Sequence, residues 1–400
     1  MVKKILMISF IMILSGCSIQ HDSVKEKETQ LLQLNQKDVE RLEFKQTNKM
    51  DTVLESSVEI PQYSDECYFQ PLMINNSGII AGKTYYQKGE EARQVYEKSL
   101  VILNTSDYVY TEIVQLDDEK NEDLLNVEND LNGGLMAVSD DSVLYYTSAP
   151  MKETKKTVVT YYVFDIKEST TIKIHEEKIH NADLVIPGGI ISDDAIYYVG
   201  ATAMNNGIYQ YDMKDHKETK IVDGTMSRYL CKVDDELYYV YGEPEKSIVG
   251  LDVYSLKTKK IDHLIKENHS KSNMIISKIL VEGSDLFIIC DLSANDSIIY
   301  QMSTKTKEIV PLFKTSYVSS VSMFHGMLTW ASGSTIPQRA RLQQYIYDYK
   351  NKEDYFFDGG FLIGSESGIC WQKYLVPEKD IGKGQSFMPE NSALLYKPYS

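Results

Sequence analysis

The sequence is poor in the residue types and spacings that mark common catalytic and metal sites. Only seven of its 400 residues are histidine, and the closest pair, His175 and His180, is five positions apart. Two zinc ligands on one helical face need a separation of about four, so we expect this pair to be solvent-exposed turn residues. The segment 364–368 has Glu366 where a nucleophile elbow has serine. The sequence therefore predicts no metal, no cofactor and no catalytic residue.

Arginine is also scarce. Five of the 42 basic residues are arginine, whereas acidic residues number 58, and the formal net charge is −16. A surface with this excess of negative charge repels phosphate backbones and anionic headgroups, so the charge disfavours nucleic acid as a partner. The high ratio of lysine to arginine, together with 29 tyrosines, is typical of proteins from AT-rich genomes. A low-GC Gram-positive bacterium is therefore the expected source.

No hydrophobic run is long enough to cross a membrane as a helix, which needs roughly 20 apolar residues. The run Ile5–Leu14 has ten residues, is interrupted only by Ser9 and follows Lys3 and Lys4. A short apolar run behind positive charge is typical of a signal peptide. We therefore predict that residues 1–16 direct export and are removed.

The end of this run, Leu14-Ser15-Gly16-Cys17, resembles the lipobox of bacterial lipoproteins. Small residues before the cysteine admit the chain to the signal peptidase, and the thiol is the group that takes the diacylglycerol. Because two acyl chains give stable anchoring, we predict that Cys17 is lipidated and holds the protein at the outer face of the cell membrane. Residues 17–51 are polar, and we expect a flexible or partly helical tether.

One sequence signature recurs seven times: one or two acidic or small residues, followed by an apolar and aromatic strand. Asp141–Tyr146 and Asp235–Tyr239 are two of the copies. The spacings between one anchor residue of each copy are 64, 53, 41, 49, 41 and 42 residues. The anchors are Gly78, Ser142, Ala195, Glu236, Asp285, Gly326 and Gly368. Propeller blades repeat at about 40–50 residues, so the spacing favours a propeller.

Each copy is preceded by one apolar stretch and followed by two further short strands with a polar turn between them. Four short strands per repeat are typical of a blade. Tyr145-Tyr146 and Tyr238-Tyr239 make the second strand aromatic on both sides, which suits a sheet packed on both faces. We therefore predict an all-β fold, a seven-bladed β-propeller of four-stranded antiparallel blades over residues 52–400. A β-sandwich, or two β domains in series, is the alternative.

The last repeat ends at 394–396 and leaves no room for an outer strand before Ser400. The segment 52–60 has no repeat of its own, and we predict that it supplies this strand and closes the ring. Closure removes exposed sheet edges that would otherwise invite aggregation. We expect the protein to be a monomer.

The repeats resemble the propellers of YVTN-type, TolB-like and quinoprotein-like proteins. The resemblance spans residues 52–400 and concerns architecture alone. No WD dipeptide ends the blades, no calcium loop of the D-x-[DN]-x-[DN]-G type is present, and two tryptophans are too few for the docking pattern of the quinoproteins. Because one fold hosts many functions, the resemblance implies a propeller and no particular activity.

Acidic pairs and cysteines also occur within the repeats. Three acidic pairs precede the second strand of a blade, where aspartate accepts local backbone hydrogen bonds, so we expect them in turns rather than in catalysis. These pairs are Asp140-Asp141, Asp193-Asp194 and Asp234-Asp235. Four cysteines lie inside apolar strands, and we expect buried free thiols, although an even number also permits disulfides. They are Cys67, Cys231, Cys290 and Cys370.

The irregular loops between second and third strands are expected on one face of the propeller. Three of the five arginines and several aromatic residues fall at or near this face. Aromatic residues and arginine are common anchors of recognition surfaces, and loops on rigid scaffolds often carry function, so we predict a ligand-binding site there. Its candidate residues are Tyr86, Arg228, Tyr241, Trp330, Arg339 and Trp371. The alternative for both tryptophans is a place in the core between blades.

Functions of different kinds fit this sequence. The one we expect is a binding or scaffold module for a protein, a peptide or a cell-wall glycan. The alternatives are a hydrolase or lyase acting on envelope polysaccharide or peptides, and a sensory ectodomain. An enzyme requires converging carboxylates, or a set of tyrosine, histidine and arginine, at the mouth of the channel. The residues do not name a ligand.

Overall fold

The computed structural model contains twenty-seven β-strands in the part of the chain that it describes. The described residues are 39, 41, 54, 56–64, 66–87, 95–116, 132–151, 156–180, 187–192, 195–202, 206–243, 248–268, 274–293, 296–316, 318–332, 343–375 and 392–399. Within them, no helix has the length and apolar character needed to span a membrane.

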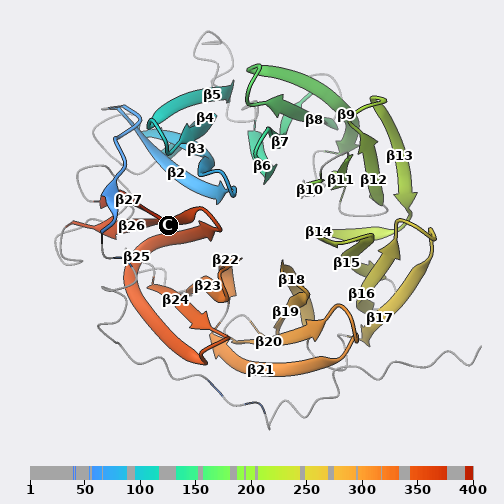
Figure 1. Cartoon of the computed structure of the whole chain (residues 1–400). Helices are drawn as coiled ribbons and strands as arrows, with labels where there is room; N and C mark the ends of the chain where they lie inside the picture. The colour runs from blue at the N-terminus through green and yellow to red at the C-terminus, as the bar shows by residue number, and fades with distance from the viewer. Residues whose placement is uncertain are drawn as a thin grey trace, which may run out of the picture.

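Seven four-stranded antiparallel blades are arranged in a ring (Figure 1). In blades one to five the four strands follow one another in the chain and pair in sequence order. Blades one to three consist of β2 (Cys67–Ile74), β3 (Ile79–Gln87), β4 (Val95–Asn104), β5 (Val109–Gln115), β6 (Asn132–Val138), β7 (Ser142–Pro150), β8 (Lys156–Asp165), β9 (Thr170–His180), β10 (Gly188–Ser192), β11 (Ala195–Val199), β12 (Ile208–Asp212) and β13 (Lys217–Val222). Blades four and five consist of β14 (Thr225–Val233), β15 (Glu236–Glu243), β16 (Ile248–Ser255), β17 (Ile261–Asn268), β18 (Ile275–Glu282), β19 (Asp285–Asp291), β20 (Asp296–Ser303) and β21 (Ile309–Ser316).

Blades six and seven share one long strand. The remaining strands are β22 (Val318–Phe324), β23 (Met327–Ser332), β24 (Gln343–Asp348), β25 (Glu353–Ser365), β26 (Gly368–Tyr374), β27 (Ser392–Pro398) and β1 (Val58–Glu59). The first part of β25, 353–358, pairs with β24 as the outer strand of blade six. Its second part, 359–365, pairs with β26 as the inner strand of blade seven. One continuous strand therefore joins the rim of one blade to the centre of the next.

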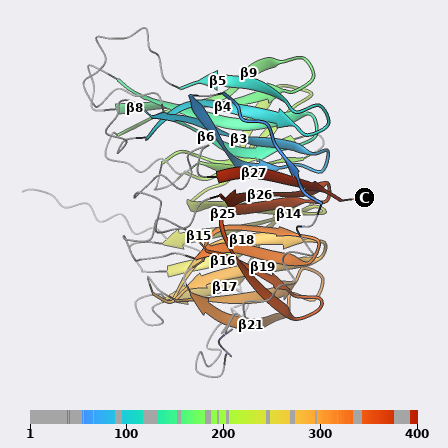
Figure 2. The same ribbon diagram turned by 90° about the vertical axis from the view of Figure 1, so that its left-hand side faces the viewer.

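The inner strands form an unbroken circuit. In chain order β2, β6, β10, β14, β18, β22 and β25 each contact the next, and β25 contacts β2. Figure 2 shows the same ring edge-on, with the strands running across its thickness. Each of the seven predicted anchor residues opens the second strand of its blade or immediately precedes it. The predicted seven-bladed propeller is therefore confirmed.

The core lies between neighbouring blades rather than at the centre of the ring. Phe287, Phe313 and Trp330, from blades five and six, are essentially fully buried in one such cluster. Tyr198 and Tyr239 are likewise at most 1% exposed, in two clusters that contain residues of blade three. The double-faced aromatic strands of the sequence thus pack against a neighbour on each side. Burying such a side chain contributes roughly 1.5–3 kcal/mol.

An N-terminal strand lies at the outer edge of blade seven, but it is shorter than predicted. Among the described residues of the segment 52–60, only β1 is a strand, with Val58 opposite Tyr396 and Glu59 opposite Leu395 of β27. The backbone N–H of Ile60 continues the pairing by donating to Leu394 at 2.8 Å.

Buried side chains add to this attachment of the N-terminal segment. Leu54 and Ile60 are 9% and 3% exposed, in clusters that contain residues of blade seven. The indole N–H of Trp371 donates to the Ser57 hydroxyl at 3.2 Å. Side-chain burial on either side of β1 thus supplements the two strand pairs.

We expect replacement of Ile60 with alanine to lower the free energy of unfolding by about 2–4 kcal/mol, because the change leaves a cavity under the N-terminal segment. Val58→Ala is the matched control. Val58 is 46% exposed, and its truncation should cost less than about 1 kcal/mol. Urea denaturation of both variants measures the difference, and equal losses would contradict a closure held by Ile60.

Two residues of the predicted tether lie against blade five. The Arg41 guanidinium is 2.8 Å from Asp296 Oδ1, and its backbone forms a parallel bridge with Lys314 of β21. Val39 packs against the core cluster that contains residues of blades four and five. The chain therefore meets the rim of blade five before it reaches blade seven.

Candidate functional site

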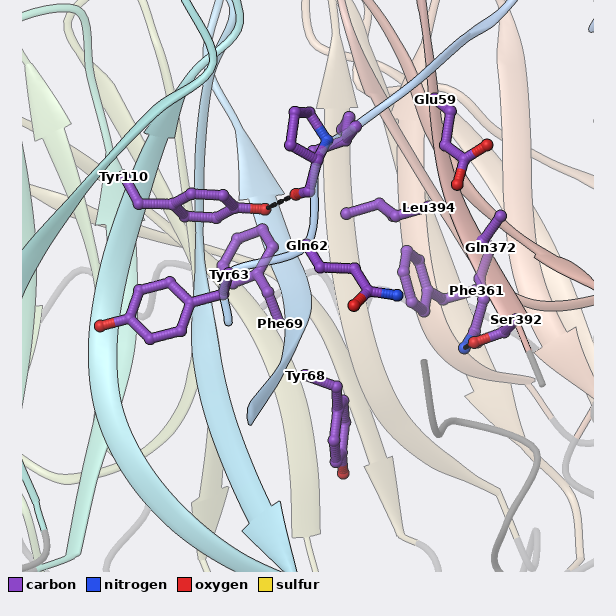
Figure 3. Close-up of a pocket in the computed structure, with 13 residues that line it drawn as sticks. Glu59, Gln62, Tyr63, Tyr68, Phe69, Tyr110, Phe361, Gln372, Ser392 and Leu394 are labelled. Atoms are coloured by element: carbon purple, nitrogen blue, oxygen red, sulfur yellow. Dashed lines mark hydrogen bonds between the residues drawn. The ribbon is translucent and has the colours of Figure 1, made fainter. Parts of the chain in front are cut away.

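A pocket lies at the joint between blades seven and one, and we call it the ring-joint pocket (Figure 3). It contains about 480 Å³ of space outside the protein atoms, part of it open to solvent. The lining residues are Glu59, Ile60, Pro61, Gln62, Tyr63, Tyr68, Phe69, Tyr110, Phe361, Gln372, Ser392, Ala393 and Leu394. They come from the N-terminal segment, from blade one and from blade seven.

The segment 59–63 forms one wall of the ring-joint pocket and is bonded to both blades. On the side of blade seven, Ile60 donates to the backbone of Leu394 at 2.8 Å. On the side of blade one, the Tyr110 hydroxyl donates to the Pro61 carbonyl at 2.9 Å, the bond drawn as a dashed line in Figure 3. The pocket therefore exists only when the N-terminal segment spans the joint.

Aromatic rings fix the side of the pocket that belongs to blade one. The rings of Tyr63 and Tyr110 meet edge to face at a centroid distance of 5.2 Å, and Phe69 meets Tyr110 in the same way at 5.3 Å. Tyr68 stacks on Tyr85 at 5.1 Å. Pairs of this geometry contribute roughly 0.5–1.5 kcal/mol beyond burial, so the rings present a preformed surface.

The amide of Gln372 supplies a polar group on the opposite side. Its Nε2 donates to the Ser392 hydroxyl at 2.9 Å. Gln372 is only 5% exposed, and its Oε1 is buried without a hydrogen-bond partner among the described residues. A buried acceptor without a partner costs about 1–3 kcal/mol. A ligand that donates a hydrogen bond would remove this cost.

The tyrosines of the pocket are neutral donors near neutral pH. Burial raises the pKa of Tyr68 to about 12, and the nearby Glu97 adds to the rise. Burial likewise raises the pKa of Tyr110 and, with Glu112, that of Tyr63. Glu59 is the one charged residue that lines the pocket. The pocket therefore suits a ligand that is uncharged, has apolar faces and carries hydroxyl or amide groups.

Tyr86 and Tyr241, two of the candidate ligand-binding residues, are half-buried in β3 and β15. Tyr86 stacks on Tyr96 at a centroid distance of 5.5 Å. The Tyr241 ring covers Gly250, where an added Cβ would lie 2.2 Å from it. Neither lines the ring-joint pocket, and a role in ligand binding stays a prediction for both.

The two tryptophans lie in the core, the place that the sequence offered as the alternative to a ligand-binding role. Trp330 is 0% exposed and stacks between Phe313 and Tyr345. Trp371 is 9% exposed and bonds Ser57 through its indole N–H. Their aromatic faces are covered by protein because each strand turns one side to a neighbouring blade, so we do not retain them as ligand contacts.

The other candidate residues cannot be placed in a site. The backbone of Arg228 lies in β14, and its side chain lies outside the described residues. Arg339 and Cys17 lie outside them as well. None of the four candidate residues whose side chains the structure describes lines the ring-joint pocket.

The expectation that His175 and His180 are exposed turn residues is wrong for His175. It lies in β9 with a side chain 12% exposed, 3.0 Å from Glu177 Oε1 and 2.6 Å from Glu218 Oε1. Three aromatic rings contact it at centroid distances of 5.1–5.6 Å: Tyr161, Tyr198 and Tyr209. The reason is the length of β9, which runs for eleven residues and turns this side chain toward blade three.

The expectation of buried free thiols is confirmed. The four cysteines that the structure describes are free and buried, and burial raises the pKa of Cys231 to about 12. Asp140-Asp141 and Asp234-Asp235 lie in turns before second strands, as expected, whereas Asp193-Asp194 lies outside the described residues. Within the described residues, no group of three or more His, Cys, Asp or Glu side chains is placed to hold a metal ion.

Sequence reasoning missed the residues that line the ring-joint pocket. Tyr63 lies shortly before the first blade and Tyr68 lies at the start of its first strand, and no copy of the repeat signature marks either position. Phe361 sits after the bend in β25, which the sequence does not show. Gln372 follows Trp371, so the position beside a predicted contact was the one available signal.

Comparison with solved structures finds other propellers. A prolyl endopeptidase matches with a TM-score of 0.52 and 14% identity over 84% of this chain and 50% of that one. The β-propeller domain of the Trilobed protease from Pyrococcus furiosus matches with a TM-score of 0.49 and 10% identity, over 78% of this chain and 90% of that one. TolB from Acinetobacter baumannii matches with a TM-score of 0.43 and 10% identity, over 73% of this chain and 79% of that one.

These likenesses concern the fold alone. The chain spans about half the length of the prolyl endopeptidase that it matches. A comparison with protein families finds no match, and a comparison with curated protein sequences finds none. The chain is a seven-bladed β-propeller protein, and its function has to be argued from its own residues.

One buried carboxyl outside the pocket titrates near physiological pH. Asp252 in β16 is 4% exposed, with Oδ1 2.9 Å from His263 Nδ1 and Oδ2 3.5 Å from the Tyr239 hydroxyl. Burial raises the pKa of Asp252 to about 6 from 3.8, although His263 opposes the rise. Between these values the folded chain holds a proton that the unfolded chain releases, so the free energy of unfolding falls as pH rises through this range.

We expect Asp252→Asn to raise the free energy of unfolding near neutral pH by on the order of 2 kcal/mol, because the variant avoids a buried charge. The gain should shrink below about pH 5, where the native carboxyl is protonated. Urea unfolding at several pH values measures both chains. A difference in unfolding free energy between the two chains that does not change with pH would contradict the raised pKa of Asp252.

Proposed function

We propose that this protein is a lipid-anchored extracytoplasmic propeller that binds a neutral glycan of the cell envelope in the ring-joint pocket. The observation that carries the proposal is a lining that combines the amide side chain of Gln372 with the rings of Tyr63, Tyr68 and Phe361. Sugar rings pair with such a surface, because their C–H faces pack on aromatic rings and their hydroxyls bond polar groups.

The charge and the strand pairing of the pocket favour a glycan over a peptide or protein segment. Lysine, arginine and histidine are absent from the lining, and Glu59 is the one acid, so an anionic polymer finds no partner there. β1 and Ile60 cover residues 394–396 of the edge strand β27, so an extended peptide cannot add to that part of the strand. A neutral sugar needs neither a counter-charge nor a free strand edge.

Binding of N-acetylglucosamine oligomers by the purified protein, measured by calorimetry, tests this proposal. Tyr68→Ala and Gln372→Leu should each weaken binding about tenfold or more, the usual cost of losing a central contact. Tyr86→Ala, which changes a tyrosine of the same blade outside the pocket, should leave the affinity unchanged.

Three results would overturn the assignment of the pocket. One is an equal loss in the Tyr86 control, and another is no binding of any neutral glycan. The third is cleavage of the oligomers during the titration, which would favour the degradative enzyme that the sequence left open.

The membrane anchor belongs to the same proposal and rests on the lipobox-like end of the apolar N-terminal run. Cys17→Ala should remove the site of acylation and release a folded propeller into the medium. Cell fractionation, with a lipid-labelling assay on both chains, checks this outcome. A Cys17→Ala protein that stays in the membrane fraction would show that something other than a lipid holds it.

A further inference from the structure

A second pocket, which we call the blade-three groove, lies between blades three and four. It contains about 690 Å³ of space outside the protein atoms and is lined by residues of β11, β12, β13 and the end of β16 with its following turn. It shares no residue with the ring-joint pocket. The inference drawn from it goes beyond the proposed glycan binding.

The register of blade three explains why polar side chains gather in the groove. Tyr197 pairs with Gln210, which in turn pairs with Thr219, and Asp212 pairs with Lys217. Residues directly opposite one another in a sheet point to the same face. One face of this blade therefore carries these five polar side chains toward blade four, beside the apolar residues that blades three and four bury between them.

Two tyrosines at the floor of the groove lack a hydroxyl partner. Tyr197 and Tyr254 are only 5% and 6% exposed, both line the groove, and neither hydroxyl bonds another described residue. Burial raises the pKa of Tyr197, with a smaller contribution from Asp235, so this hydroxyl is a neutral donor. Neither hydroxyl is among the fully buried polar atoms that lack a partner, so both hydroxyls are accessible from the groove and available to a ligand.

The rim carries charges of both signs that do not neutralise one another. Asp212, Asp215, Lys217 and Lys259 all line the groove, and none forms an ion pair with another described residue. Asp212 Oδ1 accepts the backbone N–H groups of residues 214 and 215, at 2.9 and 2.8 Å. Two ammonium groups and two carboxylates thus line one pocket without forming an ion pair among the described residues.

We propose that the blade-three groove binds a short peptide with free termini. The terminal carboxylate pairs with Lys217 or Lys259, and the terminal ammonium pairs with Asp212 or Asp215. Gln210, Thr219 and the two tyrosine hydroxyls bond the peptide amides, and an apolar side chain packs on the apolar part of the floor.

The probe is trialanine, titrated calorimetrically into the purified full-length protein, with N-acetyl-trialanine-amide as the comparison. We expect trialanine to bind and the blocked peptide to bind at least about tenfold more weakly, because it lacks both charges. The double variant Lys217→Gln/Lys259→Gln should bind trialanine more weakly by a similar factor. Lys220→Gln is the matched control, since Lys220 lies on the same strand and pairs with Asp223 outside the groove.

Tyr197→Phe removes only the floor hydroxyl and should weaken trialanine binding several-fold, so it tests the site even if the double variant fails to fold. Tyr68→Ala, in the ring-joint pocket, should leave trialanine binding unchanged whether or not that pocket binds glycan. The proposal is overturned if trialanine does not bind at millimolar concentration, if the blocked peptide binds equally well, or if Tyr197→Phe has no effect. Loss of binding in Tyr68→Ala would also overturn it, by placing the peptide in the other pocket.

Discussion

The packing of each blade against two neighbours is the constraint on which this structure depends. The strands of a blade are apolar on both faces, as in β11, where all five residues are buried. A sandwich of two such sheets would leave one apolar face of each sheet in water, whereas a closed ring of blades covers both faces of every sheet. The circuit of contacts from β2 through β25 and back to β2 satisfies this requirement.

A closed ring made from a linear chain must have one joint, and here the joint also makes the pocket. Blade seven takes its three inner strands from the C-terminal end and pairs its outer edge with β1. Polar bonds span the same joint on the other side of the ring, where Ser365 and Ser367 donate to the backbone of Asn75. Because the N-terminal segment is both an edge strand and a pocket wall, a ligand bound at the proposed site would stabilise ring closure.

Blade three departs from the pattern of the other blades. Its strands β10, β11 and β12 have five residues each, and its face toward blade four carries polar side chains of the groove beside an apolar cluster. On the opposite face, toward blade two, His175 bonds carboxylates of both blades, Glu177 and Glu218. Blade three is therefore joined to blade two by polar contacts that the aromatic repeats do not predict.

The sequence by itself determined the all-β class, the number of blades and the position of each second strand, because spacing and two-sided apolar strands are local properties of the chain. It also indicated that Cys67 and Cys370 are buried thiols, since both lie within apolar strands. Only the tertiary structure decided which side chains share a pocket. Tyr63, Phe361 and Gln372 are up to about three hundred positions apart and meet because the ring brings the chain ends together, whereas Trp330 is covered because a neighbouring blade packs on its face.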